Sequence, residues 1–185
     1  MRLRARRILI ATLALVALPG CPDRDDPVVM TTAAGEVRTD GEVLEATRAL
    51  AQAVMESVLA VRPKLQDPAV RELATELLED HRDARERAMV LARRLGLELE
   101  PTPLSRQVER DAEERRAWYV ERRGVLLDVE WLGGIRERLE QARDVLERHL
   151  VPTARAPEVR ELTQDLRRLV ADQLARVDAV PRAGR

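Results

Sequence analysis

The chain has 185 residues, a length typical of one domain, and a formal net charge of −1. Hydrophobic residues make up 45% of it, charged residues 35% and aromatic residues only 2%, a mixture that with helical periodicity is typical of an all-α protein. Basic residues alternate with acidic ones along the expected helix faces and form no basic patch. This distribution argues against nucleic acid as a partner.

Residues 1–20 have the features of an export signal. Arginines at positions 2, 4, 6 and 7 precede an apolar stretch, residues 8–18, that is too short to span a bilayer. The sequence LPGC follows, ends at Cys21, and resembles the lipobox of bacterial lipoproteins. The resemblance implies cleavage before Cys21 and attachment of diacylglycerol to its sulfur. An ordinary signal peptide followed by an incidental cysteine is the alternative.

Cys21 is the only cysteine, so it cannot form an intramolecular disulfide in an exported protein. This favours lipidation of Cys21, with the membrane as a partner and a location at the cell envelope, on its periplasmic side. Residues 21–39 contain acids, prolines and threonines without periodicity and are expected to form a flexible tether. We expect the folded domain at 40–180 and a short tail at 181–185.

Four long amphipathic helices are expected within the domain, each with apolar side chains at three- and four-residue steps. Their expected ranges are 40–62, 68–95, 125–150 and 157–180. Asp40 is expected to cap the first helix and Pro152 to end the third. Gly133 and Gly134 indicate either a close approach of the third helix to another helix or a local kink.

An internal repeat suggests how these helices pair. The segments PAVREL at 68–73 and PEVREL at 157–162 share the pattern PxVREL, and each opens the second helix of a hairpin. Two packed hairpins make a four-helix bundle, joined here by a long, partly helical crossover at 97–124. Ser105 is expected to cap the helical part of this crossover. One long crossover is the connectivity of ferritin-like bundles.

Two stretches, DPAVRELATELLEDH at 67–81 and LARRLGLELEPTPLS at 91–105, resemble an exported bacterial family of ferritin-like helical proteins. The family is domain of unknown function 4142, and its members are described as predicted outer-membrane proteins. The resemblance implies a ferritin-like bundle and further histidines on the third and fourth helices. This chain has Leu139 and Gln173 at those positions, so the partners of a metal site are missing.

His81 lies on the apolar stripe of the second helix, directly after Asp80. We expect a buried histidine that hydrogen-bonds Gln173 or Asp80; a ligand or proton-transfer role is the alternative. A ferritin-like di-iron site needs a glutamate three residues before the histidine, where this chain has Leu78.

The chain therefore offers no complete metal, cofactor or catalytic site, and we expect a non-enzymatic, membrane-anchored lipoprotein. Its bundle is expected to bind an unknown protein or small ligand, or to serve the envelope in another non-catalytic way. The alternative is a bundle that binds a metal or a small ligand through His81 and nearby carboxylates.

Overall fold

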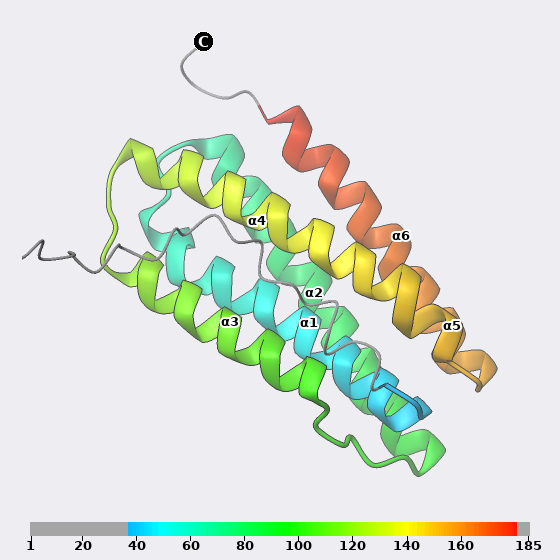
Figure 1. The fold of residues 1–185 in the computed structure, drawn as a ribbon. Coiled ribbons are helices and arrows are strands. Elements are labelled where there is room, and N and C mark those ends of the chain that lie inside the picture. Colours follow the sequence, from blue (N-terminus) through cyan, green and yellow to red (C-terminus); the bar gives the residue numbers. More distant parts are fainter. Residues whose placement is uncertain (1–36, 181–185) are drawn as a thin grey trace, which may run out of the picture.

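The computed structural model describes residues 37–180 and is shown in Figure 1. These residues form five helices of at least 18 residues, and this part of the chain contains no strand. The helices are α1 (Asp40–Val61), α2 (Pro68–Leu95), α3 (Pro103–Val120), α4 (Val125–Val145) and α6 (Pro157–Ala179). The predicted all-α bundle is confirmed. No helix between residues 37 and 180 is long and apolar enough to cross a membrane.

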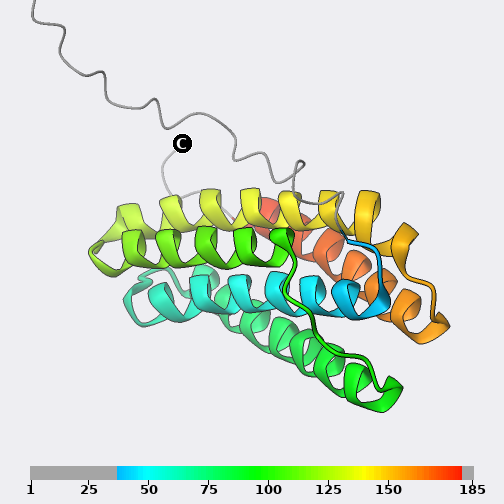
Figure 2. The ribbon, with the colours of Figure 1, turned by 60° about the horizontal axis from the view of Figure 1, so that its bottom comes forward.

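Helix α1 occupies the centre of the bundle. It contacts α2, α3, α4 and α6, and Figure 2 shows it between α3 and α2. Because neighbours surround it, 15 of its 22 residues are buried, far more than the single apolar stripe of a surface helix. Small residues such as Ala46, Ala49 and Ala53 allow the surrounding helices to approach its backbone closely. The hydrophobic core is therefore built around α1.

Helix α3 forms the helical part of the crossover and packs along α1 as a fifth helix. Leu104, Val108 and Ala112 are its buried apolar side chains nearest the start. An ion pair also joins the two helices, since Arg48 Nη2 lies 2.6 Å from Glu109 Oε1. The crossover thus supports the core directly, although its sequence is mostly charged.

The start of α3 differs from the prediction. Thr102, not Ser105, is the N-cap, because its hydroxyl accepts a hydrogen bond from the Ser105 amide at 3.0 Å. Ser105 completes the reciprocal pair, since its hydroxyl accepts from the Thr102 amide at 2.9 Å. A serine at the third helical position of such a pair looks like a cap in the sequence.

The start of α1 also differs from the prediction. Thr39, not Asp40, is the N-cap, and it forms a capping box with Glu42. Val37 packs into the hydrophobic core with only 6% of its surface exposed. Val37 and Thr39 therefore contact the folded bundle, whereas the tether expected before it lies mostly outside the described residues.

Two aspartates hold the hairpins α1–α2 and α4–α6 together at their turns, and we call these contacts the aspartate clasps. Asp128 of α4 accepts hydrogen bonds from the two backbone amides before Pro68, with the shortest at 2.7 Å. Asp40 of α1 accepts from the two amides before Pro157, at 2.7 and 2.9 Å. Each aspartate thus closes the turn of the other hairpin, which explains why Asp40 does not cap its own helix.

The PxVREL repeat is structural at both places. Arg71 Nη2 donates to the Leu65 carbonyl at 2.6 Å, and Arg160 Nη2 donates to the Ala154 carbonyl at 2.9 Å. Both arginines therefore reach back six residues and brace the turn before their own helix. The valine and leucine of each repeat are buried in the core: Val70, Leu73, Val159 and Leu162.

The end of the third predicted helix lies beyond Pro152. After α4, a π-helical turn (Leu146–Leu150) and a short helix, α5 (Val151–Thr153), continue the same direction. In the wider turn the Val151 amide donates to the Leu146 carbonyl. This irregular segment accommodates Pro152, which has no N–H to donate. The prediction that Pro152 ends the helix is wrong by one residue.

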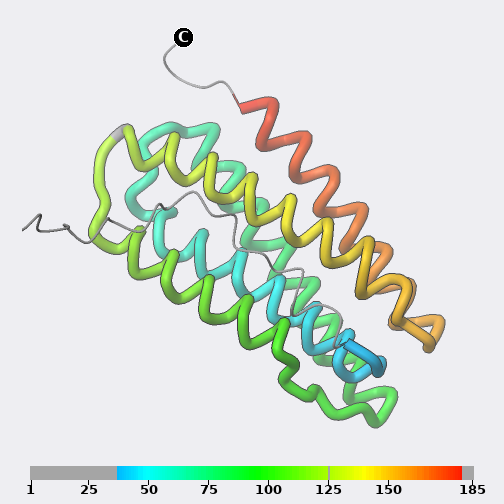
Figure 3. The backbone as a smooth tube through the Cα atoms, in the orientation of Figure 1, coloured from blue at the N-terminus to red at the C-terminus, as the bar shows by residue number. Residues whose placement is uncertain are grey.

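Figure 3 shows that the start of α1, the end of α2 and the start of α6 lie at the same end of the bundle. A Cβ atom added to Gly41 there would lie 2.3 Å from the Glu98 carbonyl oxygen. Only glycine therefore lets the loop after α2 pass so close to α1. The predicted close approach at Gly134 is also present, since a Cβ there would lie 2.4 Å from Tyr119 Oη.

Candidate functional site

Asp80, Gln173 and His81 form one hydrogen-bonded chain between α2 and α6. Gln173 Nε2 donates to Asp80 Oδ2 at 3.1 Å, and Gln173 Oε1 lies 2.9 Å from His81 Nε2. Because the amide nitrogen faces the carboxylate, the amide oxygen accepts, so the network assigns the His81 proton to Nε2. The structure thus brings together the three polar residues that the sequence singled out, and the predicted hydrogen bond between His81 and Gln173 is present.

The inner end of this hydrogen-bonded chain, formed by His81 and Gln173, is closed to water. His81 and Gln173 each expose only 1% of their surface. Burial lowers the pKa of His81 to about 4, although the hydrogen bond to Gln173 and the charge of Asp80 oppose this effect. The imidazole is therefore neutral at pH 7, and its Nδ1 has no hydrogen-bond partner. A general acid or base works best with a pKa near the working pH, which this histidine does not have.

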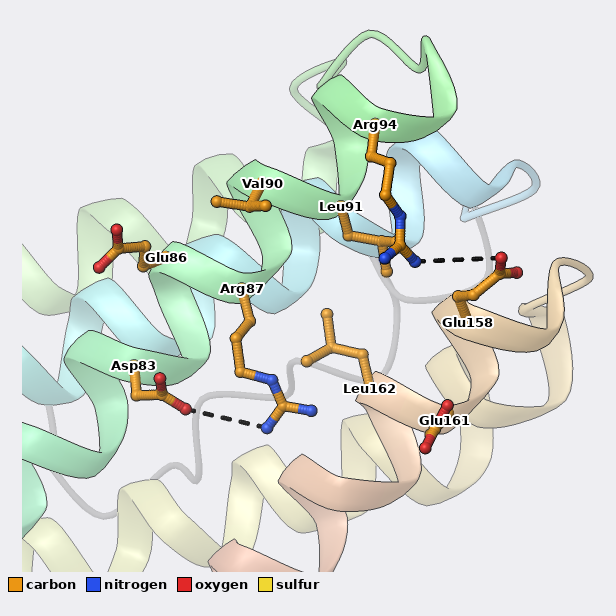
Figure 4. A pocket seen from close by; sticks show the side chains of 9 residues that line it. All are labelled: Asp83, Glu86, Arg87, Val90, Leu91, Arg94, Glu158, Glu161 and Leu162. Carbon is orange, nitrogen blue, oxygen red and sulfur yellow. Dashed lines mark ion pairs between the residues drawn. The ribbon is translucent and has the colours of Figure 1, made fainter.

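Asp80, at the outer end of this hydrogen-bonded chain, lines a groove between α2 and α6. The groove consists of two adjoining cavities of about 490 and 430 Å³, which share Asp83, Arg87 and Leu162. Figure 4 shows the second cavity, where Val90, Leu91 and Leu162 lie among charged side chains. We call these two cavities together the α2–α6 groove.

The α2–α6 groove combines an apolar floor with paired charges at its edges. Leu162 is buried in the floor, whereas Val90 is 45% exposed. At the edges, Arg87 Nη2 lies 2.7 Å from Asp165 Oδ2, and Arg94 Nη2 lies 3.9 Å from an oxygen of Glu158. Exposed ion pairs of this kind contribute little to stability, so these charges remain available to a partner.

The groove is rich in carboxylates but lacks the geometry of a metal site. Within residues 37–180, no three histidine, cysteine, aspartate or glutamate side chains lie close enough together to hold a metal ion. Asp80 and His81 are both engaged by Gln173, and Leu139 is fully buried in the core. Binding of a metal or small ligand through His81 stays a prediction.

Ser57 and His149 are not part of the hydrogen-bonded chain of Asp80, Gln173 and His81. Cys21 lies outside the described residues. Ser57 is buried on α1 and accepts a hydrogen bond from Trp131 Nε1 of α4 at 3.2 Å. This contact between the two hairpins was not predicted, although a serine on an apolar stripe indicates a buried partner. His149 is only half-buried in the π-helical turn.

The fold and the site define a class of protein: an all-α bundle of two clasped hairpins with a crossover helix, a buried polar chain and a charged groove. Residues 29–180 match the family described as Domain of unknown function (DUF4142), so the chain belongs to that family. No curated protein matches the chain, and no solved structure does.

Proposed function

We propose that the protein is an exported lipoprotein, anchored to the cell envelope through Cys21, whose bundle has a non-catalytic binding role on the periplasmic side. The observation that supports lipid attachment at Cys21 is the sequence LPGC, which follows a positively charged and then an apolar segment. A lipid-modified cysteine explains why an exported chain has one thiol and no partner for it. Two or more acyl chains make such an attachment stable.

The structure supports a binding role for the bundle rather than a catalytic one. The histidine that the sequence singled out is neutral, buried and engaged by an amide. By contrast, the α2–α6 groove offers exposed apolar surface beside ionic groups, the combination through which proteins recognise partners. Two hairpins joined by one long crossover support a ferritin-like assignment of this bundle.

The anchor is tested by Cys21→Ser in the full chain, with Pro22→Ser as a control that keeps the thiol. We expect wild type and Pro22→Ser in the membrane fraction after a high-salt wash, and both should incorporate labelled fatty acid. Cys21→Ser should instead be released into the soluble exported fraction, because lipid then no longer holds the chain. If Cys21→Ser stays in the membrane fraction after the salt wash, the anchor is not Cys21.

A second candidate function is binding of a metal or small ligand by His81 with nearby carboxylates. One observation favours it, namely that His81 Nδ1 has no hydrogen-bond partner. If instead the bundle folds without metal, as its uninterrupted core predicts, a strong chelator leaves the melting temperature of the purified protein unchanged. A large fall in melting temperature, together with stoichiometric metal in elemental analysis, would favour the second candidate.

A further inference from the structure

A separate cavity of about 480 Å³ lies between α3 and α4 and shares no lining residue with the α2–α6 groove. Residues of both helices line it. Helix α3 contributes Asp111, Glu114 and Trp118 to the wall, and α4 contributes Gly134 and Arg138. Its volume lies within the roughly 300–1,000 Å³ typical of small-molecule sites. We call it the α3–α4 cavity.

Arg138 is a buried cation that interacts with the charges of Asp111 and Glu137 but forms no direct ion pair with either. Only 5% of its surface is exposed, and it makes no ion pair with any described residue. Its one hydrogen bond is long, with Nη2 3.5 Å from the Asp111 carbonyl oxygen, and its Nε has no partner at all. Burial and the charge of Arg115 lower the pKa of Arg138 to about 10, so the guanidinium is still charged at pH 7. An unpaired buried charge opposes folding, which makes it unexpected as a purely structural residue.

Asp111 supplies an unpaired charge of opposite sign to the same cavity. Its Oδ2 atom is buried without a hydrogen-bond partner, and burial raises the pKa of this carboxyl, against the effect of Arg138. Glu114 adds a second carboxylate one helical turn further along α3. Glu137, in contrast, is engaged by Arg115, whose Nη2 lies 3.3 Å away. The α3–α4 cavity therefore presents both signs of charge, and Asp111 and Arg138 attract each other without forming an ion pair or a hydrogen bond between their side-chain charges.

Two aromatic side chains complete the wall. Tyr119 is buried, and its hydroxyl comes so close to α4 that only glycine fits at position 134. Trp118 is half-buried. Its ring meets the Tyr119 ring edge to face, with centroids 5.1 Å apart, and the Arg122 guanidinium carbon lies over it, 3.5 Å from its centroid. This part of the wall is aromatic, and it suits a small hydrophobic group.

We propose that the α3–α4 cavity binds a small zwitterion of the α-amino acid type. Its carboxylate pairs with Arg138, its ammonium group pairs with Asp111, and its side chain packs against Trp118. A simple anion would be repelled by Asp111 and Glu114, and a simple cation by Arg138, whereas a zwitterion satisfies both unpaired charges. The assignment rests on the binding role proposed above and gives it a place and a ligand class.

The test is calorimetric titration of the full purified chain with individual L-amino acids, with acetate and methylammonium as single-charge controls. We expect saturable binding of at least one amino acid and none of either control. Arg138→Met should weaken this binding about tenfold or more, because a charge-assisted hydrogen bond is lost. Arg143→Met, an exposed arginine on the same helix, should leave it unchanged. The unliganded Arg138→Met protein should melt at the same or a higher temperature, since a buried unpaired charge is removed.

Asp111→Asn provides a second measurement that does not depend on Arg138→Met folding. It should weaken amino-acid binding and make acetate binding detectable, because it removes only the negative charge. The zwitterion proposal is overturned if no amino acid binds, if Arg138→Met binds as well as wild type, or if acetate binds wild type as tightly as any amino acid. Cys21→Ser should bind amino acids normally, so failure of the anchor and failure of this site are distinguishable.

Discussion

The neutral state of buried His81 predicts a specific dependence of stability on pH. In the unfolded chain the imidazole has an ordinary pKa of about 6.5, whereas burial lowers it to about 4 in the folded protein. Between these values the unfolded state binds a proton that the folded state does not. The stabilisation from His81 is therefore complete above about pH 6.5 and is lost as the pH falls towards 4.

The size of this effect follows from the two pKa values. Each pH unit between them corresponds to about 1.4 kcal/mol, so the full difference amounts to about 3 kcal/mol. His81→Gln removes the titrating group, but glutamine can still hydrogen-bond Gln173. At neutral pH this variant therefore lowers the free energy of unfolding only through altered packing. We expect it to unfold more easily than wild type at pH 7 and to lose less stability on acidification.

The measurement is urea unfolding followed by helical circular dichroism at about pH 7.5 and about pH 4.5. Wild type should lose roughly 2–3 kcal/mol more free energy of unfolding than His81→Gln over this interval. Carboxylates titrate in both proteins and cancel in the comparison. His149→Gln, which replaces the other histidine, should behave like wild type. Equal losses in wild type and His81→Gln would refute the assignment of a neutral buried histidine.

Two further predictions concern the hairpin turns. Asp128→Ala should lower the free energy of unfolding by about 2–4 kcal/mol, because two backbone amides lose a charged acceptor. Asp40 is more exposed, so Asp40→Ala should lower it by less. Urea unfolding of the two variants measures this order, and a reversed order would contradict it. Gly41→Ala should cost about 1–3 kcal/mol through its clash with the Glu98 carbonyl, while Gly133→Ala, with open space around it, should stabilise the helix by up to about 1 kcal/mol. Equal melting temperatures of these two alanine variants would contradict the close approach at Gly41.

The helices could be predicted from the sequence because periodicity and end signals agree. The second helix begins and ends as expected, with Asp67 as its cap and Gly96 in the left-handed conformation after it. The wrong caps at Asp40 and Ser105 have one cause. Each lies beside or within a reciprocal pair that begins with a threonine, and several residues there can act as caps. Which of them does so depends on where the neighbouring turn lies.

The two polar sites differ in how far they could be predicted. The contact of His81 with Gln173 followed from their positions on the apolar stripes of the second helices of the two hairpins. The α3–α4 cavity could not be predicted in this way, because Arg138 and Asp111 look like the other charged residues of their helices. Their burial depends on how far α3 and α4 lie apart, and a charged sequence carries no signal for that distance.

The aspartate clasps have a consequence for how chains assemble. Each carboxylate accepts hydrogen bonds from amides of the other hairpin and not of its own. A hairpin alone therefore cannot satisfy the amides at its turn. A chain in which only one hairpin has folded therefore displays one free acceptor and one free pair of donors, and a second such chain displays the same set. Refolding at high protein concentration would accordingly favour exchange of whole hairpins between two chains, with the segment between α3 and α4 as the hinge, because α3 packs along α1.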